Sequence, residues 1–192
     1  MSVLKHAWER VRDYAIFESE RDAYPQSFSE ELNEQCGRIL FVVSLITSVA
    51  WLPYIYLDAM LHPEEPLLPV IRIGLSVFSV IIFILYISKR FLQYNMLFLV
   101  LIGAYLAIGC GLITALADAD PVYVGGYIFI LTVMALVPVD RRYALVIIAA
   151  SLLTFFVVGR LENIDFNRPS DRYSLQDLSS ATVVAIAFIY LM

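Results

Sequence analysis

Long runs of apolar residues, separated by short polar turns, make up most of this chain after residue 38. Several of these runs have the length that a helix needs to cross a bilayer, about 20 residues. The pattern predicts an all-α polytopic membrane protein whose transmembrane domain, residues 39–192, is a six-helix bundle. We expect its helices at about 39–57, 68–88, 91–116, 121–138, 142–159 and 178–192.

Residues 1–38 are polar, yet they also carry a helical pattern. An apolar stripe from Leu4 to Ala15 recurs at helical spacing, with basic residues largely off the stripe. This predicts an amphipathic N-terminal helix, which lies either on the membrane surface or on a partner protein. Ser27 and Glu30 fit a capping box, so we expect a second helix to begin there and to run into the first span.

The distribution of Lys and Arg predicts the orientation of the bundle. These residues concentrate in the N-terminal region and in the turns 88–91 and 140–142, which share one side. The loops 58–66 and 117–120 on the other side hold acidic residues and no Lys or Arg. Because short loops rich in Lys and Arg stay in the cytoplasm, we expect a multi-pass protein of the cell inner membrane with a cytoplasmic N-terminus.

The last apolar run is short for a span. From Leu178 to Met192 a helix would rise about 22 Å, against roughly 30 Å for a bilayer core. No Lys or Arg follows it. Either this helix is short and stops at the membrane interface, or the chain is the membrane half of a longer protein. We expect the second, with a cytoplasmic output domain after helix six.

Composition and motifs exclude several classes of function. Hydrophobic residues make up 60% and charged residues 16% of the chain, whereas soluble domains hold about half and a quarter. The net charge of −5, without a basic patch, argues against nucleic-acid binding. His6 and His62 lie on opposite sides and cannot share a metal ion. No hydrolase or phosphate-loop motif occurs, so we predict no catalytic residue, cofactor or metal site in this chain.

Arg72 is the one charge well inside an apolar run, about one turn into the second span. Charges within a membrane are costly and usually mark an ion pair or a functional site. Candidate partners are Asp58, just past the first span, and Asp118 or Asp120 beside the fourth. The alternative is an unpaired arginine that extends to the lipid headgroups.

Tyrosines gather toward the same side of the membrane. They either form the aromatic belt typical of a membrane interface or line an outward-facing pocket together with Arg72. On the second interpretation the pocket binds an external or lipophilic ligand. Its candidate ligand-binding residues are Arg72, Asp58, Tyr54, Asp118, Asp120, Tyr123 and Tyr127.

Two short stretches carry a resemblance to a known family. Residues 120–128 hold Tyr123 and Gly126, which look like the Tyr-x-x-Gly stretch that opens the fourth span. Residues 141–144 look like the basic turn that opens the fifth. Together with six spans and short loops, they resemble the N-terminal membrane domain of bacterial class III adenylate cyclases. Related modules precede some diguanylate cyclases and histidine kinases.

The resemblance implies a membrane sensor and anchor domain, a receptor module in signal transduction and cAMP biosynthesis. It would form a homodimer in the lipid bilayer and pass a signal through helix six to an output domain outside this chain. We expect the dimer contact on the side of helix six that holds Ser179, Ala181 and Ala185, because small residues allow close approach. The alternative is a non-enzymatic accessory subunit of a larger membrane protein complex.

Overall fold

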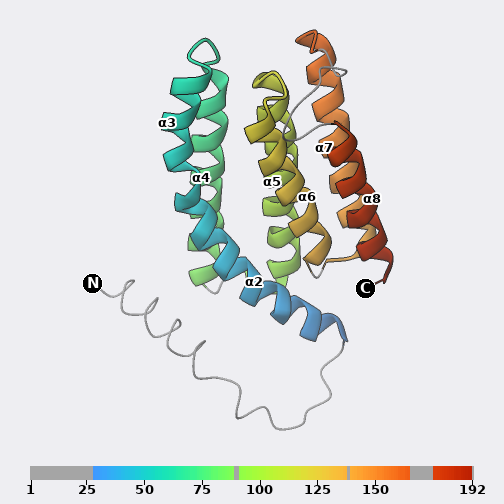
Figure 1. Ribbon diagram of the computed structural model, residues 1–192. Coiled ribbons are helices and arrows are strands. Elements are labelled where there is room, and N and C mark those ends of the chain that lie inside the picture. Colours follow the sequence, from blue (N-terminus) through green and yellow to red (C-terminus); the bar gives the residue numbers. More distant parts are fainter. Residues whose placement is uncertain (1–27, 89–90, 138, 165–174, 192) are drawn as a thin grey trace, which may run out of the picture.

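The computed structural model describes residues 28–88, 91–137, 139–164 and 175–191 (Figure 1). Within these ranges the regular elements are helices: α2 (Phe28–Ala50), α3 (Leu52–Leu61), α4 (Leu67–Ile87), the short 3₁₀ helix η1 (Leu92–Tyr94), α5 (Asn95–Leu116), α6 (Pro121–Leu136), α7 (Arg141–Leu161) and α8 (Leu175–Leu191). The all-helical fold is confirmed for these residues. The amphipathic helix expected between Leu4 and Ala15 lies outside them.

The helices run up and down in alternation, and α5 stands at the centre of the bundle (Figure 1). It contacts α2, α4, α6 and α7. One apolar cluster joins α2 and α4 to α5 around Leu40, Ile82 and Ile102. Another joins α6, α7 and α8 around Leu131 and Phe155. The bundle therefore consists of an α2–α4 half and an α6–α8 half that share the central helix.

Four helical segments are long and apolar enough to cross a membrane, judged by length and composition: Glu31–Leu61, Leu67–Ile87, Asn95–Leu116 and Arg141–Leu161. α6 and α8 have 16 and 17 residues, or lengths of about 24 and 26 Å. Each of the six predicted runs is helical, but membrane crossing by α6 and α8 stays a prediction.

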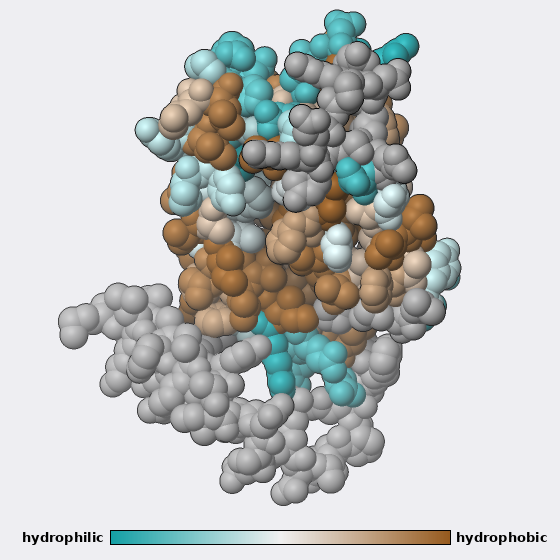
Figure 2. Space-filling view, viewed as in Figure 1, coloured by the Kyte–Doolittle hydropathy of each residue, from teal (hydrophilic) through white to brown (hydrophobic). Residues whose placement is uncertain are grey.

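The molecular surface has the banded polarity of a membrane protein. In the space-filling view, apolar side chains dominate the middle of the face shown, and polar residues gather toward its two ends (Figure 2). We call the end that holds the α3–α4 and α5–α6 turns the upper end (Figure 1). Large apolar side chains are exposed on several helices and include Ile46, Phe129, Val146 and Leu153. A bilayer would cover such side chains, because lipid tails are as apolar as they are.

The first span differs from its predicted bounds of 39–57. The helix begins directly after the expected cap Ser27, runs to the end of α2 and resumes as α3 after a break at Trp51. Pro53 explains the break, because proline has no N–H to donate and its ring clashes with the carbonyl of the residue four positions earlier. The amide of Tyr54 instead donates to the carbonyl of Trp51 at 3.2 Å. Beyond the break, α3 runs more upright than α2 (Figure 1).

A contact between distant parts of the sequence fixes the start of α5, which begins at Asn95 and not at residue 91 as predicted. Tyr94, at the N-cap position, makes no side-chain bond to the helix. Asn33 of α2 supplies this cap from another helix, since its Oδ1 accepts from the amide of Met96 at 3.2 Å. The Asn95 side chain donates to the Asn33 carbonyl at 3.4 Å. Together these bonds join α2 to the beginning of α5.

The contact face of α8 corrects one expectation about dimerisation. Ala185 is only 1% exposed and lies in the apolar cluster between α8 and its neighbours in the same chain. The prediction that Ala185 contacts a second copy is therefore wrong. α8 packs along α6, and its exposed side carries Val183 and Val184.

Candidate functional site

Arg72 and Asp58 form a buried ion pair near the upper end of the bundle. Asp58 lies in the last turn of α3 and Arg72 in the second turn of α4. The side chains are 0% and 4% exposed. Arg72 Nε donates to Asp58 Oδ2, and Nη2 donates to Oδ1 at 2.9 Å. The bidentate geometry is the strong form of this interaction, and the short turn between the two helices brings the residues together.

Tyr123 adds a third helix to this pair. It lies in the first turn of α6, and its hydroxyl donates to Asp58 Oδ1 at 2.9 Å. The Asp58 carboxylate thus accepts hydrogen bonds from both α4 and α6. A buried carboxylate requires such partners, because its charge has lost the solvation of water. We call Asp58, Arg72 and Tyr123 the carboxylate cluster.

Aromatic rings surround the guanidinium of Arg72. Its central carbon lies 5.4 Å from the Trp51 ring centroid, 5.0 Å from that of Tyr54 and 5.8 Å from that of Tyr123. The faces of such rings attract a cation within about 6 Å. His62 packs edge-on against Tyr123, with ring centroids 5.4 Å apart. The cluster is therefore enclosed by side chains from α3, α4, α6 and the α3–α4 turn.

The predicted pairing of Arg72 with Asp58 is confirmed, and the alternative of an unpaired arginine is wrong. The other acids suggested as partners do not pair with Arg72. Asp118 is exposed in the α5–α6 turn, where its φ of 53° is left-handed. Asp120 is the N-cap of α6, and its Oδ1 accepts from the amide of Val122 at 2.8 Å. Whether any of these residues binds a ligand stays a prediction.

Tyr127 belongs to a different polar contact, one turn further along α6. Its side chain is 1% exposed, and its hydroxyl lies 2.8 Å from Ser151 Oγ of α7. Ser151 donates to the carbonyl of Ala107 on α5 at 2.5 Å. Because that bond uses the serine proton, Tyr127 is the donor to Ser151. The close approach depends on Gly111, where a Cβ would lie 2.8 Å from the Ser151 carbonyl oxygen.

Sequence reasoning missed three residues near the carboxylate cluster. Trp51 Nε1, His62 Nε2 and Ser76 Oγ are buried atoms without a hydrogen-bond partner, and Asn95 Oδ1 at the other end of α5 is the fourth such side-chain atom in the described ranges. The available signal for Ser76 was its position four residues after Arg72, since such residues share a helix face. The sequence carried no comparable signal for Trp51 or His62, because the contact of Trp51 with Arg72 and that of His62 with Tyr123 depend on how the helices pack.

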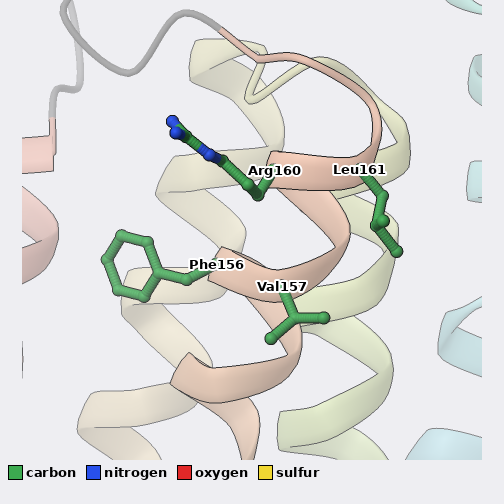
Figure 3. A pocket seen from close by; sticks show the side chains of 4 residues that line it. All are labelled: Phe156, Val157, Arg160 and Leu161. Atoms are coloured by element: carbon green, nitrogen blue, oxygen red, sulfur yellow. The ribbon is translucent and has the colours of Figure 1, made fainter.

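A recess on the outside of α7 has a different character. Its volume is about 440 Å³, and its lining consists of Phe156, Val157, Arg160 and Leu161. Phe156 and Arg160 point to one side of the helix, and Val157 and Leu161 point to another (Figure 3). One helix supplies all four side chains, and Arg160 is the one charged group among them. Because polar groups from several elements do not converge here, the carboxylate cluster is the stronger candidate site.

The described residues include no group of three or more His, Cys, Asp or Glu side chains that could hold a metal ion. Comparison of the chain with models of protein families, with curated proteins and with solved structures gives no match. In the part of the chain that the structure describes, the regular elements are helices, four segments are of membrane-spanning length, and a buried, charge-balanced cluster lies near one end.

Proposed function

We propose that this chain is a membrane sensor and anchor domain that passes a signal from the carboxylate cluster to α8. One observation carries the proposal: Tyr123 of α6 is hydrogen-bonded to a carboxylate that α3 and α4 hold in place. This bond connects the α2–α4 half of the bundle directly to the α6–α8 half. A signal that alters the cluster would therefore act on α6.

The three bonds of Asp58 differ in how easily they can be broken. Removal of one partner from a buried ion pair costs about 3–5 kcal/mol in soluble proteins, and separating Asp58 from Arg72 would leave both charges unpaired. Releasing Tyr123 leaves the ion pair intact and removes one bond to a charged group, worth about 1.5–3 kcal/mol. Coupling free energies between allosteric sites are typically about 1–3 kcal/mol. The Tyr123 bond is accordingly the one suited to switching.

Packing supplies a route from Tyr123 to α8. α6 and α8 lie against each other, and Leu131, Leu178 and Ile189 share their common apolar cluster. Packed helices tend to move between discrete arrangements, because close-packed interfaces do not deform continuously. A shift of α6 would therefore change the position of α8.

The resemblance to the membrane domains of class III adenylate cyclases supports the rest of the proposal. It suggests an inner-membrane homodimer with a cytoplasmic N-terminus, in which α8 acts on a cytoplasmic output domain of the cyclase type. The exposed side of α8 at Val183 and Val184 is available for contact with a second copy. Single cysteines at these two positions should form crosslinks in membranes, and a cysteine at Ala185 should not.

Spin-label distances between the two halves test the proposal. We would replace Cys36 and Cys110, then place labels at Val80 on α4 and Val184 on α8, which are 42% and 48% exposed. Tyr123→Phe removes the hydroxyl that bonds Asp58 and should change the distance distribution between the labels. Tyr54→Phe is the matched control, because it keeps the ring beside Arg72.

Identical distributions in the parent and in Tyr123→Phe, with both proteins folded, would contradict the sensor proposal. The cluster would then serve stability alone, and the accessory-subunit alternative would become the better account of the chain.

A further inference from the structure

The hydroxyl of Ser76 is in an unusual state for this protein. Serine and threonine side chains within helices commonly donate to a carbonyl three or four residues earlier. Ser88, at the C-cap of α4, makes such a bond, and so do these helical residues: Ser44, Thr47, Ser48, Thr114, Thr132, Thr154 and Thr182. Ser76 is only 5% exposed and makes neither this bond nor any other. A buried hydroxyl without a partner costs about 1–3 kcal/mol, so this state needs an explanation.

Ser76 lies on the same helix face as the carboxylate cluster. It follows Arg72 by four residues on α4, and residues four apart are neighbours on one face of a helix. Ser79, one turn further along a neighbouring face, is also buried but accepts a hydrogen bond from Thr47 at 2.8 Å. The missing partner is thus a property of Ser76 and not of α4.

Two more buried atoms that lack a hydrogen-bond partner belong to residues in contact with the same cluster. Trp51, whose ring packs on the Arg72 guanidinium, has a buried indole N–H without an acceptor. His62, which packs on Tyr123, has a buried Nε2 without a partner. An indole N–H only donates, while serine and histidine can donate or accept. A bound group that meets these three atoms must therefore offer at least one acceptor.

The charge of the cluster restricts what this group can be. Arg72 and Asp58 balance each other, and their side chains are 4% and 0% exposed. An anion or a cation added beside them would be a buried charge without a counter-ion, which is strongly unfavourable. A neutral carbonyl or hydroxyl can accept from Trp51 without this penalty.

We propose that the carboxylate cluster, with Trp51, His62 and Ser76, binds the neutral oxygen-bearing head of an amphipathic molecule. This inference rests on the sensor function proposed above and names the chemistry of its ligand. Tyr54, whose ring centroid lies 5.0 Å from the central carbon of the Arg72 guanidinium, and Ile73, the residue after Arg72 on α4, are each 47% exposed. The apolar tail would lie there, against side chains that a bilayer covers. The cluster lies near the ends of α3 and α4, at the level where Tyr and Trp are enriched at a membrane interface. The polar head of an amphipathic molecule lies at the same level.

Trp51 provides a built-in reporter. The chain has two tryptophans, Trp8 and Trp51, so Trp8→Phe leaves one indole, in the cluster. We would place this protein in nanodiscs of a diether phosphatidylcholine, which has no ester carbonyls. Dioctanoylglycerol represents a lipid source of the oxygen groups, and a decyl-substituted benzoquinone represents a non-lipid source. Decanoate is the charged comparator.

At least one neutral probe should change Trp51 emission in a saturable way and raise the melting midpoint, and decanoate should do neither. Ser76→Ala should weaken binding of that probe about tenfold, the effect of losing one hydrogen bond of about 1.4 kcal/mol. Without a probe, Ser76→Ala should leave the melting midpoint unchanged or raise it, because the Ser76 hydroxyl has no hydrogen-bond partner in the protein. Ser79→Ala should lower that midpoint and leave probe affinity unchanged.

Tighter binding of decanoate than of either neutral probe would overturn the inference. The absence of a saturable response to both neutral probes would also overturn it. In that case ordered water would be the partner of the three buried atoms. A lower midpoint of probe-free Ser76→Ala would also overturn it. The sensor proposal is tested separately: the spin-label distances respond to Tyr123→Phe without any probe, so the ligand inference can fail while the sensor proposal stands.

Discussion

Removal of either charge from the buried ion pair should destabilise the bundle strongly. Arg72→Ala leaves the Asp58 carboxylate with Tyr123 as its remaining side-chain donor, and Asp58→Asn leaves a buried guanidinium without a counter-ion. Arginine cannot neutralise itself by releasing a proton. In soluble proteins, breaking a buried pair in this way costs about 3–5 kcal/mol. For a chain of this size, that corresponds to a fall of roughly 6–20 °C in melting temperature.

The depth of Arg72 places the expected loss at the lower end of this range. It lies five residues after the start of α4, or about 8 Å along the helix axis. A long side chain at that depth can extend toward the headgroups when its partner is lost. We therefore expect about 3 kcal/mol for Asp58→Asn. Tyr123→Phe keeps the ion pair and should cost about 1.5–3 kcal/mol, and Tyr54→Phe should cost less than either.

A double-mutant cycle identifies the shared interaction. Unfolding in mixed micelles with increasing dodecyl sulfate, followed by helical circular dichroism, would give the free energy of each variant. Arg72→Ala combined with Asp58→Asn should cost less than the sum of the single changes, by at least about 1 kcal/mol. An unchanged free energy in Arg72→Ala, or additive losses in the double variant, would refute this account of the cluster.

Three further predictions concern the rest of the molecule. A topology reporter fused after Lys89 should report the cytoplasm and one within 162–170 the external side; the opposite pattern would reverse the proposed orientation. Gly111→Ala should lower the melting temperature, because its Cβ would lie 2.8 Å from a backbone oxygen, whereas Gly126→Ala meets no atom within 4 Å and should be neutral or slightly stabilising. Asn33→Ala removes the cap of α5 and should cost about 1 kcal/mol in the unfolding assay, and an exposed Glu31→Ala change that costs as much would show that the cap has no special part.

Hydrophobic length predicted the helices well, because an apolar run near 20 residues has few alternatives in a membrane protein. It was less accurate where a local signal interrupts a run. Pro53 lies inside the predicted first span, and its effect on the helix required no knowledge beyond the missing N–H. The start of α5 depends on Asn33, more than sixty residues earlier in the chain. No local pattern around Asn95 indicates such a contact.

The Arg72–Asp58 pair was predictable because a buried arginine needs a carboxylate and few lie near enough in the sequence. The choice of Asp58 over Asp118 and Asp120 depends on helix packing, which places the end of α3 beside the start of α4. Tyr127 was grouped with the cluster because tyrosines near one membrane face look alike in sequence. Its true partner, Ser151, comes from α7, and only the packing around Gly111 brings the two together.

The balance of charge in the carboxylate cluster has a consequence for electrical sensitivity. Moving one elementary charge across a membrane potential of 100 mV involves electrical work of about 2.3 kcal/mol. Arg72 and Asp58 carry opposite charges held in direct contact, so a motion that moves them together transports no net charge through the field. A rearrangement that keeps the Arg72–Asp58 pair intact would therefore not depend on the membrane potential. Depolarisation would affect the cluster only if the two charged side chains separated.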